Sequence, residues 1–460
     1  MKYRATRLKV LFLLFSITMG GCDQYTEIDL PNDRLTGEAV FKDPLTAEAA
    51  LLDIYANMRQ RGMIAGDLSG LSILMGSYSD ELDYYGVPNS SVDTFYSHSI
   101  IASNDLVATM WELAYNQIYA ANALVEGLDT TEINEQEEIN RIKGEALFIR
   151  AFLHFYLVNL FGEIPYVTTT AYTVNSTIGR TGISEVYDNI ISDLIKAEEL
   201  LPVDYKGSFH TRPNKMAARA LLARTYLYAD KNTEAVRVVT SVINSGLYPP
   251  EMNLEKAFLK TSSATIWQLH SGEEQKKTLE AITMIPSATP PDILSLREEL
   301  VSSFETGDMR KQAWVGSISD GTDIWYYPYK YKNENPSGTA DEYSIILRIE
   351  ELYLIRAEAY AQTGNLQAAV ADLNVIRNRA GLQSMQLSDE QSVLNAVIEQ
   401  WRLEFFSEMG HRWFDLKRWN MAGQILPSIK PGWRETDMLL PIPENEIILN
   451  DQLQPQNPGY

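Results

Sequence analysis

The hydrophobic pattern of the chain is most regular between residues 345 and 382, where apolar side chains recur every three or four positions. In the second half of this stretch Leu366, Val370 and Leu373 fall on one face of a helix. Gly364 supplies a break, because glycine readily takes the left-handed conformation that ends many helices. The first half sets small alanines beside large tyrosines, which lets two antiparallel helices approach closely. The pattern predicts a tetratricopeptide-like helical hairpin.

A second hairpin of the same kind is predicted upstream, at residues 221–243. There Ala223 aligns with Ala357 and Tyr226 aligns with Tyr360. A single hairpin cannot bury its own apolar face, so repeated hairpins stack into a continuous core. The alternative is that the two segments are unrelated amphipathic hairpins.

The rest of the chain divides into helical segments and two looser regions. Further helices are predicted at residues 46–58, 111–128, 136–161, 183–201, 214–229, 233–245 and 393–409. Residues 62–103 are rich in Ser, Gly and Asp and are predicted to be a loose region. In residues 249–342 the helical period fades and short alternating pieces favour strands. We therefore expect a mainly α fold of tetratricopeptide-like hairpins, a single domain over residues 41–460, with an irregular, partly β insertion at about 249–342.

The net charge limits the partners of this fold. The chain carries 39 basic and 61 acidic residues, a formal charge of -22. Such a surface repels phosphate backbones and anionic lipid headgroups, so neither nucleic acid nor electrostatic docking on a membrane is expected. Attachment to a membrane would need a covalent route.

The amino-terminal segment supplies such a route. Residues 1–9 hold four basic residues, and residues 10–19 form an apolar run too short to span a bilayer, which is typical of a signal peptide over residues 1–21. Cys22, the single cysteine, follows two glycines at a position that resembles a bacterial lipobox, which predicts its acylation. Residues 22–40 are polar and acidic and are expected to be a flexible tether. The alternative is an ordinary cleaved signal with an incidental thiol.

Candidate binding residues come first from the aromatic cluster at residues 324–331, IWYYPYKY. Side chains alternate along a strand, so some of these rings should face outward. Flat rings stack on the apolar faces of sugars, and Trp325 and Tyr326 are the candidates here. The alternative is an inter-strand aromatic cluster, which is favoured for the tyrosines that follow them.

A second candidate group lies in the loose region at Asp83, Tyr84 and Tyr85. Polar irregular segments with clustered aromatics often carry binding residues. The alternative, a solvated loop whose tyrosines pack on the helices, is equally compatible with the pattern.

The search for catalytic chemistry gives a negative answer. Glu404 and Glu408 fall on one side of a helix, as paired carboxylates of a hydrolase would, but ion pairing of either one with Arg412, and of Glu399 with Arg402, is the favoured interpretation. The five histidines are scattered, and His154 in an apolar run reads as a core residue. No catalytic residue, cofactor or metal site is predicted.

The carboxyl-terminal sequence resembles a known family. The segments at 150–167, 348–382, 401–419 and 441–460, together with the lipobox, are similar to the SusD/RagB family of outer-membrane nutrient-binding lipoproteins. The resemblance implies a helical body with four tetratricopeptide-like hairpins, a ligand-facing insertion and no catalysis. It further implies a SusC-like TonB-dependent transporter as partner, a glycan ligand and a lipid-anchored place on the cell surface. Peptide or another nutrient as ligand, or a purely structural scaffold, are the alternatives.

Overall fold

The computed structural model describes residues 41, 43–129, 135–272, 277–333 and 340–460, so the predicted signal peptide, the tether and Cys22 lie outside the described residues. The helices of the described part are α3 Pro44–Gln60, α4 Leu71–Tyr78, α5 Ser91–Tyr96, α6 Asp105–Asp129, α7 Gln136–Phe161, α8 Tyr172–Asn175, α9 Ile183–Leu200, α10 Lys215–Tyr228, α11 Asn232–Ile243, α12 Leu279–Met284, α13 Glu298–Ser303, α14 Met309–Trp314, α15 Ile349–Gln362, α16 Leu366–Arg379, α17 Glu390–Phe405, α18 His411–Arg418, α19 Ala422–Ile425 and α20 Glu444–Leu449. Its strands are β1 Leu82–Tyr84, β2 Thr265–Leu269, β3 Leu294–Leu296, β4 Val315–Ser319, β5 Ile324–Pro328 and β6 Ser344–Arg348.

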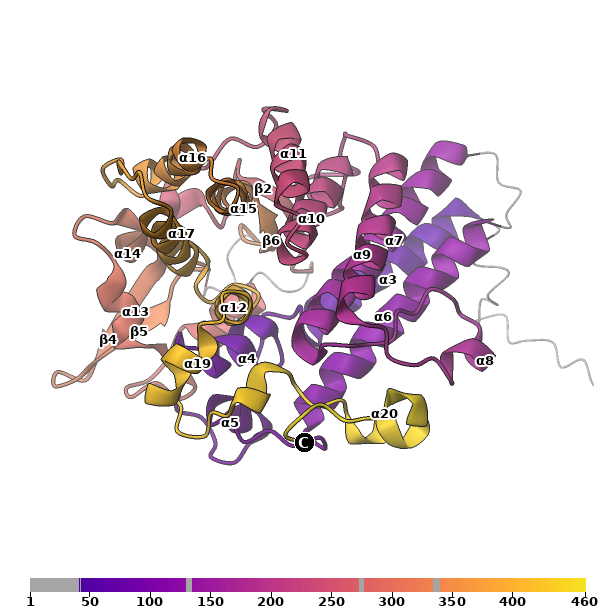
Figure 1. Cartoon of the computed structure of the whole chain (residues 1–460), viewed down its shortest axis with the longest axis horizontal. Helices are drawn as coiled ribbons and strands as arrows, with labels where there is room; N and C mark the ends of the chain where they lie inside the picture. The colour runs from indigo at the N-terminus through magenta and orange to yellow at the C-terminus, as the bar shows by residue number, and fades with distance from the viewer. Residues whose placement is uncertain (1–40, 42, 130–134, 273–276, 334–339) are drawn as a thin grey trace, which may run out of the picture.

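The long helices pack in a row across the molecule. Helix α6 packs on α7, and the row continues through α9, α10, α11, α15, α16 and α17 (Figure 1). The two hairpins expected from the sequence are α10 with α11 and α15 with α16. They pack on each other through α11 and α15, although the insertion separates them in the chain. The mainly α prediction is therefore confirmed, and the two hairpins share one core as expected.

The turns of the two hairpins differ in their residues. Gly364 ends α15 with φ of +80°, while Asp230 takes φ of +56° at the matching turn of α10 and α11. Aspartate is among the few residues besides glycine that tolerate this conformation. Ala357 and Ala359 are fully buried, which explains the small residues on α15.

Helix α7 lies at the centre of the core. It is the one helix in the described ranges that is long and apolar enough to cross a bilayer, and 94% of its most apolar window is buried among neighbouring elements. Within it His154 has an Nδ1 2.8 Å from the Arg150 carbonyl oxygen, and its ring stacks on Tyr166. Burial lowers the pKa of His154 to about 4. His154 is thus a packed core residue, as predicted.

The region at 62–103 is more ordered than predicted. It contains α4, β1 and α5, and every residue of α4 is buried. A helix buried on all sides has no polar face, so its sequence lacks the periodic pattern on which the prediction depended. The prediction of a loose region was wrong for these residues.

The insertion at 249–342 is partly β, as expected. Strand β2 pairs antiparallel with β6 just before α15, and both are buried. Strands β3, β4 and β5 join β1 in a second sheet with the order β1-β3-β5-β4. The sequence did not predict α12, α13 and α14, because helices of six residues show too few turns for a period to emerge.

Candidate functional site

The four-stranded sheet has one face against the core. Leu82 of β1 lies opposite Leu296 of β3, and Leu296 lies opposite Tyr326 of β5. All three side chains pack in the same hydrophobic cluster. Because side chains alternate along a strand, the neighbours of these residues lie on the other face. We call that other side the outer face, and it carries Asp83, Tyr85, Ser295, Arg297, Trp325 and Tyr327.

Polar contacts hold the side chains of the outer face in position along β1, an edge strand of the sheet. The Arg297 guanidinium donates to Asp83 at 2.6 Å, and the Tyr96 hydroxyl donates to the same carboxylate oxygen at 3.2 Å. The hydroxyls of Ser295 and Tyr85 lie 3.5 Å apart. Tyr85 keeps 43% of its surface exposed, so one ring and one ion pair stand side by side at this edge.

A buried lysine lies behind this edge. The Lys430 ammonium group is 3.7 Å from the centre of the Tyr96 ring and donates to the carbonyl oxygen of Ser77. Burial, reinforced by the charge of Arg297, lowers the pKa of Lys430 to about 7. Burial and the Asp83 carboxylate raise the pKa of Tyr96 to about 12. Asp83 therefore has basic groups beside and behind it, which offset the acidic charge of the chain at this place.

The aromatic cluster of the insertion is divided between the two faces of the sheet. Trp325 is half-buried on the outer face, opposite Ile318 of β4, while Tyr326 packs inward. Tyr327 lies opposite Gly316, where an added Cβ would be 2.3 Å from the tyrosine ring. Glycine at this position thus lets the ring lie against the neighbouring strand. Tyr331 lies beyond the end of β5 and is buried in the inner hydrophobic cluster.

The five candidate residues from the sequence therefore meet in one sheet but not on one face. Asp83, Tyr85 and Trp325 share the outer face, although β1 and β5 are far apart in the sequence. Tyr84 alternates to the inner side, where its ring covers Gly86 and its hydroxyl lies 3.2 Å from Ser90. Ligand binding by any of these residues stays a prediction.

Sequence reasoning missed Ser295 and Arg297. The alternating segment ILSLR at 293–297 is a strand signal that could have found them. No pattern in the sequence shows that this strand pairs with β1 on one side and β5 on the other.

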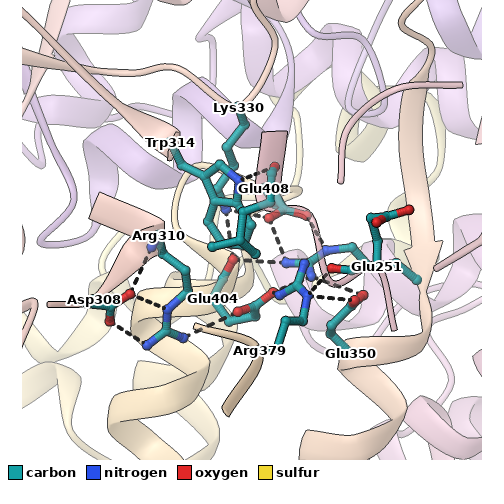
Figure 2. Close-up of polar contacts among 11 residues, drawn as sticks. Glu251, Asp308, Arg310, Trp314, Lys330, Glu350, Arg379, Glu404 and Glu408 are labelled. Carbon is teal, nitrogen blue, oxygen red and sulfur yellow. Dashed lines mark hydrogen bonds and ion pairs between the residues drawn. The ribbon is translucent and has the colours of Figure 1, made fainter. Parts of the chain in front are cut away.

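The carboxylates considered for hydrolysis are engaged in buried ion pairs. Figure 2 shows Glu404 between Arg310, at 3.3 Å, and Arg379, at 2.8 Å, and Arg348 contacts it as well. Burial would raise the pKa of Glu404, but the three guanidinium charges hold that pKa well below its usual range. Glu408 pairs with Lys330 and Arg348.

The structural role of these carboxylates was predicted, but their partners were not. Arg412 donates to Asp80 at 2.6 Å instead of to Glu404 or Glu408, and Arg402 lies 3.3 Å from Asp80 instead of pairing with Glu399. The true partners come from the insertion and the central hairpin, which sequence spacing cannot bring together. Among the described residues no group of three or more His, Cys, Asp or Glu side chains could hold a metal ion.

Two family models match segments of this chain. Residues 39–227 match a family model described as "Starch-binding associating with outer membrane", and residues 263–460 match a model described as "SusD family". The SusD-like protein P2 of Formosa agariphila is 27% identical, and the match covers 99% of this chain and all of that protein.

Solved structures share this fold. A SusD superfamily protein of Bacteroides vulgatus is 22% identical with a TM-score of 0.79, covering 91% of this chain and all of that one. A laminarin-binding SusD-like protein is 24% identical with a TM-score of 0.75, again covering 91% of this chain and all of its own. At this identity the likeness to solved structures concerns the fold.

Proposed function

Because the chain belongs to the SusD/RagB family, we propose that it binds a glycan on the outer face of its four-stranded sheet. The observation that carries the proposal is the convergence of Asp83 from β1, Tyr85 just after β1 and Trp325 from β5 on one partly exposed face. Trp325 offers a flat ring for the apolar side of a sugar. The Asp83 and Arg297 pair offers charged hydrogen-bond partners for hydroxyl groups, which are stronger than neutral ones.

Two further points support a glycan over other ligands. A protein of the same fold is named for its binding of laminarin, a glycan. The balance of charge around Asp83 suits an uncharged ligand, because the carboxylate is already offset by Arg297. Peptide binding is the second possibility from the sequence, and the experiment below separates the two.

The place of action in this proposal is the outer membrane. The family description names association with that membrane, and Cys22 supplies the site for a lipid anchor. The anchored protein would deliver its glycan to a SusC-like TonB-dependent transporter. It acts as a binding protein and not as an enzyme, in line with the buried pairing of Glu404 and Glu408.

Calorimetry with the full chain in detergent tests the proposal. The ligands are laminarin oligosaccharides, starch oligosaccharides and a set of peptides. Replacing Trp325 by Ala should weaken sugar binding by about 2 kcal/mol, about thirtyfold, because the stacking surface is lost. Ile324→Ala is the matched control, since Ile324 is the exposed neighbour on the same strand.

The outcomes separate the hypotheses. Sugar binding that is weakened by Trp325→Ala and kept by Ile324→Ala supports the proposal. Equal sugar binding in wild type and Trp325→Ala contradicts the assigned site, and binding of peptides alone contradicts the assigned ligand.

A further inference from the structure

A cleft of about 610 Å³ lies far from the outer face. Helix α6, the segment 165–178 and the carboxyl-terminal helix α20 form its walls. In Figure 1, α8 and α20 lie near one end of the long axis, while β4 and β5 lie near the other. The volume falls within the range of small-ligand sites. Its wall includes Trp111, Glu112, Tyr115, Tyr119, Tyr172 and Glu446.

The aromatic residues of α6 form a ladder along this cleft. Trp111, Tyr115 and Tyr119 are spaced four residues apart, so they lie on one side of the helix. Trp111 is buried at the base, and the Tyr115 hydroxyl donates to the Pro165 carbonyl oxygen at 2.8 Å, which holds its ring in place. Tyr119 is 52% exposed. The ladder thus runs from a fixed interior end to an open rim.

A second exposed ring lies across the cleft. Tyr172 of α8 is 81% exposed, although it lines the same space as Tyr119. A large ring kept in water, next to another one, leaves apolar surface available for a partner. The two rims of the cleft therefore both offer flat stacking surfaces.

The charged groups that line the cleft are acidic, and its other polar groups are neutral amides and hydroxyls. Glu112 and Glu446 form no ion pair with Lys, Arg or His within the part of the chain that the structure describes, and no such residue lines the cleft. Burial, and next the charge of Glu112, raise the pKa of Glu446, while a hydrogen bond from Trp111 opposes the rise. Glu112 is one position from Trp111, so carboxylates flank the aromatic ladder. This arrangement rejects anions and offers acceptors for hydroxyl groups.

We propose that this cleft is a second carbohydrate-binding site, which takes an uncharged segment of the glycan along the aromatic ladder of α6. The inference rests on the proposed function for the class of ligand, but on separate residues for the site. A chain long enough to occupy both sites would bind more tightly than a short oligosaccharide, because the second contact is intramolecular.

The test counts binding sites and compares ligand lengths. Calorimetry of the full chain in detergent uses a short laminarin or starch oligosaccharide and the corresponding polysaccharide. The wild type should bind two short oligosaccharides per chain, and the double variant Tyr119→Ala/Tyr172→Ala should bind one. Its affinity for the polysaccharide should fall at least tenfold. Ile448→Ala is the control, because Ile448 is 73% exposed on α20 but does not line the cleft.

A second variant tests the cleft without removing an aromatic ring. Glu112→Gln keeps the shape of the side chain but removes its charge, so it should weaken the cleft site without changing the outer face. Unchanged stoichiometry and polysaccharide affinity in the double variant would overturn the inference. Binding of a lysine-containing peptide in the cleft, with no sugar bound there, would also overturn it.

The same data distinguish failure of this inference from failure of the proposed function. If Trp325→Ala loses one bound sugar and the tyrosine double variant binds as wild type does, only the cleft site is contradicted. If the tyrosine double variant loses one bound sugar and Trp325→Ala binds as wild type does, only the outer-face site is contradicted, and the cleft remains as the glycan site. Absence of binding to every sugar overturns both.

Discussion

The ion network around Glu404 and the outer face of the four-stranded sheet are built from the same kinds of residue. Both contain arginines, carboxylates and aromatic rings. In the network Glu404 is fully buried and is contacted by three arginines. On the outer face the side chains of Asp83 and Arg297 keep 28% and 14% of their surface exposed.

The two regions differ in how completely their charged groups are paired within the protein. The charges of the network are paired within the protein, where removal of one partner leaves the others buried without compensation. On the outer face Asp83, Arg297 and Tyr85 keep contact with solvent and retain capacity for a ligand. Residue type alone does not separate the buried ion network from the proposed binding face, whereas the degree of burial does.

Removing the charge of Glu404 is expected to have the largest effect. Glu404→Gln leaves Arg310, Arg348 and Arg379 near one another without their shared carboxylate, and should lower the free energy of unfolding by about 3 to 5 kcal/mol. Urea unfolding measures the change. Glu399→Gln on the same helix is the control, because Glu399 is only half-buried. Equal unfolding midpoints for wild type and Glu404→Gln would contradict a structural role.

A buried carboxyl group between the two regions should make stability depend on pH. Burial raises the pKa of Glu81 to about 8, with Asp80 adding to the rise and a hydrogen bond from the Ser407 amide opposing it. The folded protein therefore keeps a proton that the unfolded chain releases above pH 4.5. The stability from this group is fully present below pH 4.5 and is lost as the pH rises through 8.

Glu81→Gln should remove this dependence. The variant should gain free energy of unfolding relative to wild type between pH 5 and 8, by at most about 1.4 kcal/mol per pH unit. Urea titrations at several pH values measure the difference. Parallel stability curves for the two proteins would mean that Glu81 does not keep its proton in the folded state.

A smaller effect is expected from the strand beside Tyr327. Gly316→Ala places a methyl group 2.3 Å from the tyrosine ring, so the ring must move. The cost should be about 1 to 3 kcal/mol, as for other overpacked positions. Gly182→Ala is the control, because an added methyl group there meets nothing within 4 Å. A crystal structure of Gly316→Ala with Tyr327 unmoved would contradict the expected displacement.

The smallest change in stability is expected at the outer face itself. Asp83→Asn breaks a partly exposed ion pair and should cost less than about 1 kcal/mol of folding free energy. Sugar affinity should nevertheless fall about tenfold, because a charged hydrogen bond to the ligand is lost. Calorimetry and urea unfolding of the same sample measure both quantities. A large loss of folding free energy without loss of sugar affinity would mean that Asp83 stabilises the fold, as Glu404 does, and does not bind the sugar.

The sequence predicted the elements that follow from the local pattern of apolar residues along the chain. The hairpins at α10/α11 and α15/α16 follow from apolar periodicity, and α7 was predicted with its bounds Gln136–Phe161. Helix α4 was not predicted, because a fully buried helix has no polar face and therefore no periodic pattern. Prediction failed where the answer depends on pairing between distant segments.

The candidate site illustrates that limit. Trp325 and Asp83 could be singled out as residue types suited to sugars, but their common face depends on the register of β3 between β1 and β5. The same register turns Tyr84 and Tyr326 inward. Residue type thus identified candidates, and strand pairing divided them between the faces of the sheet.

The order of strands in that sheet has a consequence for biosynthesis. Strand β1 lies in the segment matched by one family model, whereas β3 and β5 lie in the segment matched by the other. The amino-terminal part leaves the ribosome first, with β1 still lacking its partner strand. The outer face is therefore assembled only after residue 328 has been synthesised, and neither half of the chain expressed alone would contain it. Co-expression of the two halves as separate polypeptides would make recovery of sugar binding a direct report on their association.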